Sequence, residues 1–296
     1  MDDGRTQLNQ AGFHTLLLVA VLLVTGVVGA VGYRVISRPA DKQNAAVRWS
    51  YDNAKNAWYT SQGTAPACKE PYVFDYSPVN VDDATSVGFP GTYRGKSYKV
   101  HGTFSLSKSS EVKLPADATL DGMSRYYEGE PAELQYAVHF ETDCGVAFYF
   151  DHLYTLSPRL QELANRLPEP KRNDTRVSPN DAPPRIKMNA GDTVAVATGA
   201  PAVGRYGIDF GVIDYRHRNK ISQNRQWVAL HNSYSASEWY GACWFDMLPG
   251  GDAQKAKDLS VVQADTRRVA KFVSDYCSNA DYTTLDFNSG QPVDRY

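Results

Sequence analysis

A long uncharged segment near the N-terminus limits what this chain can fold into. From Ala11 to Tyr33 there is no Asp, Glu, Lys or Arg, and most side chains are apolar. About 20 such residues in a helix span the hydrocarbon core of a membrane. We therefore predict a transmembrane anchor within residues 1–36. A cleaved signal peptide is the alternative, because small residues surround Ala30, although the basic cluster that usually begins such a peptide is missing.

The charges on either side of this segment give conflicting indications of its orientation. One arginine precedes it, whereas Arg34, Arg38 and Lys42 follow it, which favours a cytoplasmic C-terminus. Large domains cross membranes largely regardless of such charges, and the four cysteines are typical of an oxidising exterior. We expect a single-pass protein of the cell membrane whose C-terminal domain lies outside the cytoplasm.

The composition excludes one class of partner. Of the 296 residues, 42% are apolar, which is ordinary for a globular protein. The 31 basic and 33 acidic residues give a net charge of -2. Because there is no positive surplus, we do not expect nucleic acid as a partner. The membrane, reached through the N-terminal helix, is the first expected partner.

Beyond the anchor the residue pattern changes twice. Residues 37–65 are polar with scattered Ala and Trp, and no Gly or Pro occurs between Ala40 and Gln62. This pattern predicts a helical stalk. From residue 66 to residue 296, short alternating runs are separated by Gly and Pro, which predicts a mainly β domain with a few helices.

Several segments of this domain have a clear period. Residues 98–106 alternate as one strand that places His101 on the polar face. Residues 134–140 and 145–150 form a predicted hairpin, and residues 207–214 form a strand with Asp209 opposite its apolar face. The most regular helical spacing begins at Pro158.

The four cysteines are expected to form disulfides. Cys68, Cys144, Cys243 and Cys277 lack the paired spacing of a structural zinc site. Of the three pairings, we favour Cys243 with Cys277, because both flank one C-terminal subregion, and this leaves Cys68 with Cys144. Buried free thiols are the alternative.

The order of motifs in the β domain resembles the LytM/M23 metallopeptidase domain, a duplicated hybrid motif fold. A strand with a His-Gly step at His101 is followed by Gly-x-x-x-Tyr-x-x-His-Leu over residues 145–153. An Ala-Gly-Asp turn and a Gly-Ile-Asp-Phe-Gly-Val strand over residues 207–212 come next. The resemblance implies an M23-like antiparallel β-sandwich or half-barrel. The chain is also similar to a group of membrane-anchored proteins that share Phe-Asp-His-Leu, Asp-Phe-Gly-Val and Cys-Trp-Phe-Asp.

The resemblance implies roles for three residues. His101 stands at the first zinc-ligand position, His152 at the catalytic histidine, and Asp209 at a final ligand position where the family has histidine. Two positions depart from the family, because Ser105 replaces an aspartate ligand and Gly207 replaces another histidine.

These departures leave too few ligands for a catalytic zinc. Zinc hydrolases use three protein ligands and an open position for water. Only His101 and Asp209 can be placed as metal ligands, so either another residue such as Asp151 completes the set or no catalytic zinc binds. Zinc is therefore the one cofactor that the chain could use, and we expect none.

Three functions follow from these expectations. The first is a non-catalytic extracytoplasmic domain that binds cell-wall peptidoglycan or a wall-associated protein. The second is a zinc-dependent peptidoglycan endopeptidase with an altered ligand set, in which His152 is the acid or base. The third is a structural surface module whose aromatic cluster packs internally or against a partner. That cluster consists of Trp239, Tyr240, Trp244 and Phe245. Wide separation of His101, His152 and Asp209 would favour the third function.

Overall fold

The computed structural model describes residues 47–94, 97–170, 185–261 and 274–278. The chain divides into two compact units, Met1–Ala46 and Val47–Tyr296. The predicted anchor lies outside the described residues. Within the described part of the chain, no helix combines the length and the apolar character that a membrane span requires.

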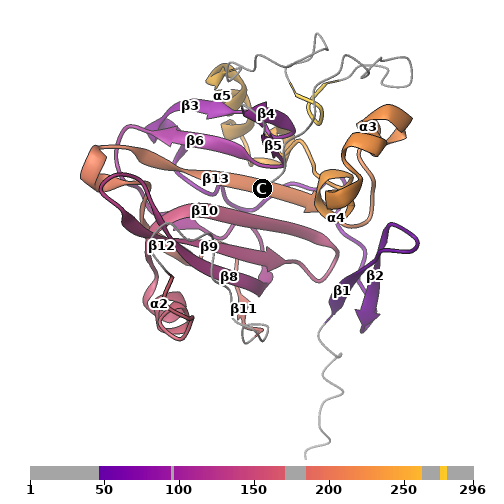
Figure 1. The fold of residues 1–296 in the computed structure, drawn as a ribbon, viewed down its shortest axis with the longest axis horizontal. Coiled ribbons are helices and arrows are strands. Elements are labelled where there is room, and N and C mark those ends of the chain that lie inside the picture. The colour runs from indigo at the N-terminus through magenta and orange to yellow at the C-terminus, as the bar shows by residue number, and fades with distance from the viewer. Residues whose placement is uncertain (1–46, 95–96, 171–184, 262–273, 279–296) are drawn as a thin grey trace, which may run out of the picture. The chain divides into compact units, whose positions relative to one another are not determined.

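A ten-stranded sheet forms the centre of the second unit (Figure 1). The strand order is β11-β8-β9-β10-β13-β6-β3-β14, and β12 pairs with both β10 and β7. The pairs are antiparallel except for β14 with β3, so the prediction of a mainly β domain is confirmed and the sheet is mixed. The strands are β3 (Ala84–Gly88), β6 (Gly102–Leu106), β7 (Val112–Lys113), β8 (Ala118–Glu128), β9 (Glu133–Glu141), β10 (Val146–Leu156), β11 (Lys187–Met188), β12 (Thr193–Thr198), β13 (Tyr206–Asp214) and β14 (Ser260–Val261).

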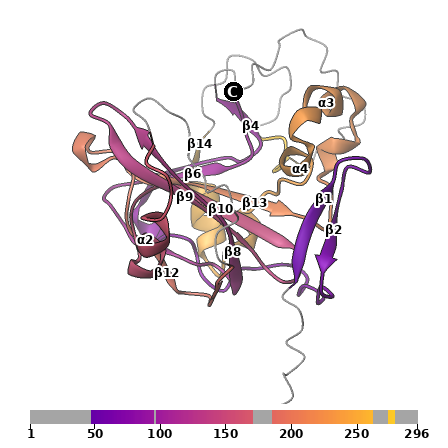
Figure 2. The same ribbon diagram turned by 60° about the horizontal axis from the view of Figure 1, so that its bottom comes forward.

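The helices of the described residues are few and short. The helix predicted at Pro158 is present as α2, and the short helices α3 and α4 lie together beside the β1–β2 hairpin in both views (Figures 1 and 2). The α-helices are α2 (Pro158–Ala164), α3 (Arg225–Leu230), α4 (Ser235–Glu238) and α5 (Asp252–Asp258), and the 3-10 helices are η1 (Val81–Asp83), η2 (Pro201–Val203), η3 (Lys220–Gln223), η4 (Asn232–Tyr234) and η5 (Phe245–Met247).

The apolar face of the central strands forms the core. Its largest side chains are almost wholly buried, and neighbouring rings meet edge to face, tilted or stacked. Strand alternation produces this face, because Ile208, Phe210 and Val212 of β13 point into the core. The alternate residues, among them Asp209, therefore lie on the opposite face. The core rings include Phe74, Phe104, Phe140, Phe148, Phe150 and Phe210.

The predicted helical stalk is wrong for the residues that the structure describes. Strands β1 (Arg48–Asp52) and β2 (Ala57–Gln62) form an antiparallel hairpin instead. The Asp52 carboxylate accepts hydrogen bonds from the backbone N–H groups of Ala54 and Lys55, and Asn56 is left-handed with φ 49°. Such side-chain bonds to the local backbone favour a turn over a helix.

Aromatic contacts attach this hairpin to the β domain. The Trp58 ring stacks on Tyr215 with centroids 3.7 Å apart, and its indole N–H donates to the Ala236 carbonyl at 2.8 Å. Trp49 contacts the same tyrosine at 5.8 Å. The compact unit therefore begins at Val47 rather than at residue 66.

The strand predicted over residues 98–106 is interrupted. Strand β5 (Ser97–Lys99) pairs with β4 (Thr92–Arg94), and β6 begins only at Gly102. A Cβ atom at Gly102 would lie 2.3 Å from the Gly88 carbonyl oxygen, so this close approach requires glycine. The interruption lets β4 and β5 fold back as a separate hairpin that carries Arg94 toward the polar face.

Both predicted disulfides are present. Cys68 is bonded to Cys144, which precedes β10, and Cys243 is bonded to Cys277. The described residues include no free cysteine. The first bond joins the segment after the β1–β2 hairpin to the turn between β9 and β10, and the second joins the C-terminal segment to the region after α4.

Candidate functional site

The three residues predicted for the site converge on one carboxylate. Asp209 lies on β13, opposite Thr103 of β6 and Asp151 of β10. The Nε2 atom of His101 lies 2.8 Å from Asp209 Oδ2, an ion-pair contact that is off the axis of a hydrogen bond. The Nε2 atom of His152 lies 3.6 Å from the same oxygen. This convergence argues against a purely structural module.

Two further residues complete the surroundings of Asp209. The Thr103 hydroxyl donates to Oδ1 at 2.7 Å, and Nη1 of Arg94 lies 3.3 Å from both carboxylate oxygens. Arg94 also donates to the Thr103 hydroxyl through Nη2. Strand alternation places Thr103 on the face of His101, so sequence reasoning could have found it. Arg94 was missed, because only the fold of the β4–β5 hairpin brings it here.

The charges around Asp209 keep it ionised. Burial alone would raise the pKa of this carboxyl group. The imidazoles of His101 and His152 and the charge of Arg94, all close to the carboxylate, outweigh burial and hold the pKa well below its usual range. Asp209 is therefore held as an anion by the side chains around it.

His152 sits in a strained part of β10. Its φ is 61°, in the left-handed region, and the pairing of β10 with β9 shifts between Phe150 and Leu153. Its backbone N–H bonds to Asp151 Oδ1 at 2.9 Å, and its Nδ1 lies 2.8 Å from the Gln135 side-chain oxygen. Such a conformation costs free energy and persists only where its surroundings hold it. Here they direct the imidazole toward Asp209.

His152 is also the most accessible of these ionisable side chains, with 33% of the side chain exposed. Burial lowers its pKa, but the nearby carboxylates of Asp209 and Asp151 outweigh burial, so the pKa is raised above its ordinary value. The imidazole therefore carries more positive charge near neutral pH than a free histidine does. This combination suits recognition of an anion or a hydrogen-bond acceptor.

The other nitrogen of His101 is held by a tyrosine. Tyr149 Oη lies 2.8 Å from His101 Nδ1, and the Tyr149 ring stacks on His139 with centroids 5.0 Å apart. A Cβ atom at Gly211 would lie 2.3 Å from the Tyr149 ring. Gly211 is therefore required for the position of Tyr149, and through it for that of His101. No local sequence signal identifies this cross-strand arrangement.

Across the described ranges of the chain, no metal-ligating side chain replaces the two ligands that are missing at Ser105 and Gly207. Ser105 pairs with Gly207, two residues along the strands from the pairing of Thr103 with Asp209. At Gly207 the φ is 151°, and a Cβ atom would lie 2.3 Å from the Phe104 carbonyl oxygen. A histidine at this position would force the backbone to move.

The donor set does not fit zinc. The Arg94 guanidinium lies against both oxygens of Asp209, where it competes with a divalent cation for the same lone pairs. Asp151, considered as a third ligand, accepts hydrogen bonds from the Tyr126 hydroxyl and from the His152 backbone N–H. Among the residues that the structure describes, no group of three or more His, Cys, Asp or Glu side chains is arranged to hold a metal ion.

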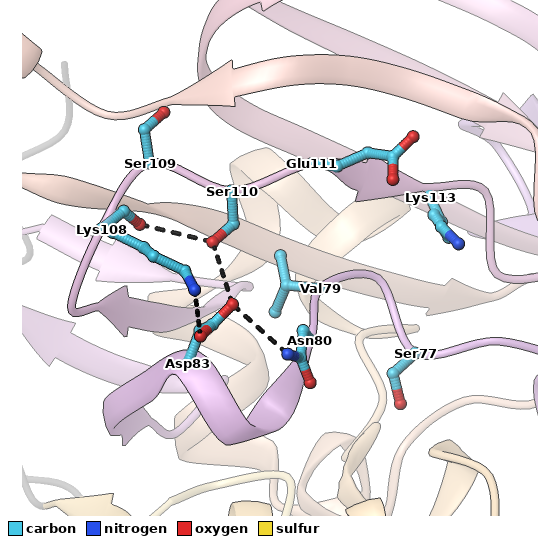
Figure 3. A pocket seen from close by; sticks show the side chains of 9 residues that line it. All are labelled: Ser77, Val79, Asn80, Asp83, Lys108, Ser109, Ser110, Glu111 and Lys113. Carbon is cyan, nitrogen blue, oxygen red and sulfur yellow. Dashed lines mark hydrogen bonds and ion pairs between the residues drawn. The ribbon is translucent and has the colours of Figure 1, made fainter.

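A separate pocket of about 440 Å³ includes none of these residues (Figure 3). In it Asp83 pairs with Lys108 at 2.9 Å and accepts from Ser110 and Asn80. Because most of its polar side chains are exposed or only partly buried and are satisfied by neighbouring protein groups, we assign no function to this pocket. It is lined by Ser77, Val79, Asn80, Asp83, Lys108, Ser109, Ser110, Glu111 and Lys113.

Comparisons with known proteins add little to this geometry. No family model matches the chain, and no curated protein matches it. Among solved structures, the chain is similar to Helicobacter pylori Csd3 from a hexagonal crystal, with 12% identity and a TM-score of 0.28. The match covers 57% of this chain and 36% of that chain, so it spans little more than a third of Csd3. A likeness at this level supports no functional conclusion.

Proposed function

We propose that this chain is a membrane-anchored, extracytoplasmic M23-like domain that binds cell-wall peptidoglycan without cleaving it. The observation that carries the proposal is the pairing of Arg94 with Asp209, at 3.3 Å, in a site where His101 and His152 also converge. In this site an arginine supplies the positive charge that a metal ion would otherwise supply. Without a metal ion, the polar face has no group of this kind to activate water for hydrolysis.

The chemistry of the open side favours wall peptide as the ligand. His152 is partly exposed and has a raised pKa, and Arg94 lies beside it on the same carboxylate. Both side chains donate hydrogen bonds to carboxylate and carbonyl oxygens. Peptide stems carry both groups, so they match this face better than an uncharged polymer does.

The disulfides support a location outside the cytoplasm. Cys68 with Cys144 and Cys243 with Cys277 account for all four cysteines, which is the pattern of an oxidising compartment. Together with the uncharged segment near the N-terminus, they favour a domain tethered to the outer surface of the membrane, within reach of the wall.

Zinc-dependent hydrolysis is the second candidate, and the convergence of His101, His152 and Asp209 favours it. The two candidates differ in the role of Arg94. If Arg94 replaces the metal, the wild-type chain holds no stoichiometric zinc, and Arg94→Ala increases zinc affinity because Asp209 is released. If the site is a zinc centre, the wild-type chain itself binds zinc, and His101→Ala abolishes binding.

The test uses the full-length chain purified in detergent. Metal content is measured by mass spectrometry, and binding is measured by cosedimentation with purified peptidoglycan sacculi. We expect no stoichiometric zinc, sedimentation of the wild-type chain, and several-fold weaker binding for His152→Asn. Lys108→Ala, in the separate pocket, is the matched surface control and should bind normally. Stoichiometric zinc with release of wall peptides, or failure of the wild-type chain to sediment, would overturn the proposal.

A further inference from the structure

Arg94 reaches the site from a hairpin that lies outside the ten-stranded sheet. Within the part of the chain that the structure describes, strands β4 and β5 form a two-stranded sheet of their own, in the register Thr92↔Lys99, Tyr93↔Tyr98 and Arg94↔Ser97. A two-stranded hairpin is marginally stable by itself. Because successive side chains of a strand point to opposite sides, a contact that fastens Tyr93 on one side presents Arg94 on the other.

A buried imidazole fastens Tyr93. The Tyr93 hydroxyl lies 2.9 Å from His231 Nε2, and His231 Nδ1 lies 2.5 Å from Glu238 Oε2. Since an ionised carboxylate only accepts, Nδ1 carries a proton, and Nε2 forms the hydrogen bond with the Tyr93 hydroxyl. The Trp227 ring stacks on His231 at 4.1 Å, and the Tyr98 ring contacts it at 4.3 Å. His231 is 1% exposed, so this support is shielded from water.

The C-terminal residues 274–277 fasten the start of the same hairpin. The Ser274 hydroxyl donates to the Pro90 carbonyl at 2.5 Å, and the Asp275 backbone N–H donates to the Gly91 carbonyl at 2.8 Å. The Asp275 carboxylate accepts from the Trp227 indole N–H at 3.0 Å. One short segment therefore connects the hairpin to the helix that holds the imidazole.

Tyr276 and Cys277 close this connection. A Cβ atom at Gly91 or at Gly241 would lie 2.6 or 2.4 Å from the Tyr276 ring, so both glycines leave room for it. The Tyr276 hydroxyl donates to the Glu238 carbonyl at 2.9 Å, and the next residue is bonded to Cys243. Residues 274–277 thus form a covalently closed clip around the base of the β4–β5 hairpin.

We infer that Tyr93 and His231 are positioning residues for Arg94, and that the clip of residues 274–277 holds them in place. The guanidinium at Asp209 is then set by contacts on the far side of the hairpin, among residues that do not face the site. This inference goes beyond the proposed function, because it concerns how the arginine is held whether or not the face binds peptidoglycan.

The test measures how readily Arg94 reacts with phenylglyoxal, a reagent that modifies accessible guanidinium groups. The full-length chain in detergent is treated, and modification of individual arginines is followed by peptide mass spectrometry. Arg185 is the internal reference, because its side chain is 20% exposed and paired with Glu141, as Arg94 is 20% exposed and paired with Asp209. We expect similar protection of both arginines in the wild-type chain.

Tyr93→Phe removes only the hydroxyl that bonds to His231. We expect Arg94 to react about fivefold faster, the ratio that corresponds to a net hydrogen bond of ~1 kcal/mol, with Arg185 unchanged. Tyr98→Phe is the matched control, since Tyr98 meets the same imidazole through its ring. An unchanged rate for Tyr93→Phe, or an equal increase for Tyr98→Phe, would overturn the inference.

A double variant, Cys243→Ser with Cys277→Ser, tests the clip independently of the tyrosine. We expect faster modification of Arg94 with Arg185 still protected, at a temperature where circular dichroism shows a folded chain. An equal increase at both arginines indicates general loosening and contradicts a clip. Because the readout needs neither zinc nor wall material, failure of sacculus binding would count against the proposed function alone.

Discussion

Two imidazole–carboxylate pairs in this domain differ in how far they are closed to water. In the first, His231 and Glu238 have side chains that are 1% and 9% exposed, and stacked aromatic rings cover the imidazole. In the second, His101 and Asp209 are 12% and 8% exposed, and the neighbouring His152 is 33% exposed. A pairing of imidazole with carboxylate thus forms an internal support in one place and part of a more accessible polar face in the other.

The carboxylates of the two pairs also differ in how many side chains contact them. Among the residues that the structure describes, the Glu238 carboxylate pairs with one imidazole, whereas that of Asp209 is contacted by His101, His152, Arg94 and Thr103. Removing the partner of an enclosed hydrogen-bonding group is costly, because no water can replace that partner. A carboxylate that is shared among several donors, some of them near solvent, can release a donor to a ligand at smaller cost.

The largest expected effect is the loss of the enclosed pair. Glu238→Ala should lower the free energy of unfolding by about 3 kcal/mol, because it leaves the buried N–H of the His231 imidazole without its carboxylate acceptor. Asp209→Ala should cost less, about 2 kcal/mol, since Arg94 and His152 can turn toward water. Denaturant unfolding at neutral pH measures both. A larger loss for Asp209→Ala than for Glu238→Ala would reverse the comparison.

A smaller effect is expected from crowding the open site. Gly211→Val should cost about 2 kcal/mol, because the new side chain would meet the Tyr149 ring and separate its hydroxyl from His101. Gly251→Ala is the control, since a Cβ atom there meets no atom within 4 Å. Equal unfolding midpoints for the two variants would show that Tyr149 has room to move.

The pH dependence of stability tests the open site through His152. The raised pKa of His152 means that its contribution is fully present below its ordinary value of 6.5 and is lost as the pH rises through the raised value. The difference in Tm between the wild type and His152→Asn should therefore shrink from pH 6 to pH 9. Asparagine is chosen because it tolerates the left-handed backbone. A difference that grows with pH would contradict this assignment.

The smallest effect is expected at an ion pair on the surface. Lys108 and Asp83 are 2.9 Å apart, but the lysine side chain is 66% exposed. Lys108→Ala should leave the unfolding midpoint unchanged within error, because exposed pairs contribute little. A clear loss of stability would mean that the pocket of Figure 3 supports the fold more than its exposure suggests.

Features with a local cause could be predicted from the sequence. Alternation located the β9–β10 hairpin and β13, and a regular helical spacing located α2. The order of motifs brought His101, His152 and Asp209 to attention, and the structure places them around one carboxylate. Each of these depends on residues that are close in sequence or on a resemblance to a family.

Features with a distant cause could not be predicted in this way. The break before Gly102 depends on its contact with Gly88, and the entry of Arg94 depends on a hairpin supported by His231. The helical stalk was predicted because a polar segment with scattered Ala and Trp lacks Gly and Pro, whereas Asp52 favours a turn and contacts with Tyr215 and Ala236 hold the hairpin. In each case, contacts between residues far apart in the sequence determine the local structure.

The bond between Cys68 and Cys144 also defines a path for mechanical load. A pull on the residues before Val47 reaches the β1–β2 hairpin first, which is held by the pairing of two strands and by its aromatic contacts with the β domain. Extension then stops at Cys68, where the covalent link passes the tension to the turn between β9 and β10. The hairpin can therefore unfold under load while the ten-stranded sheet and the polar face on it stay intact.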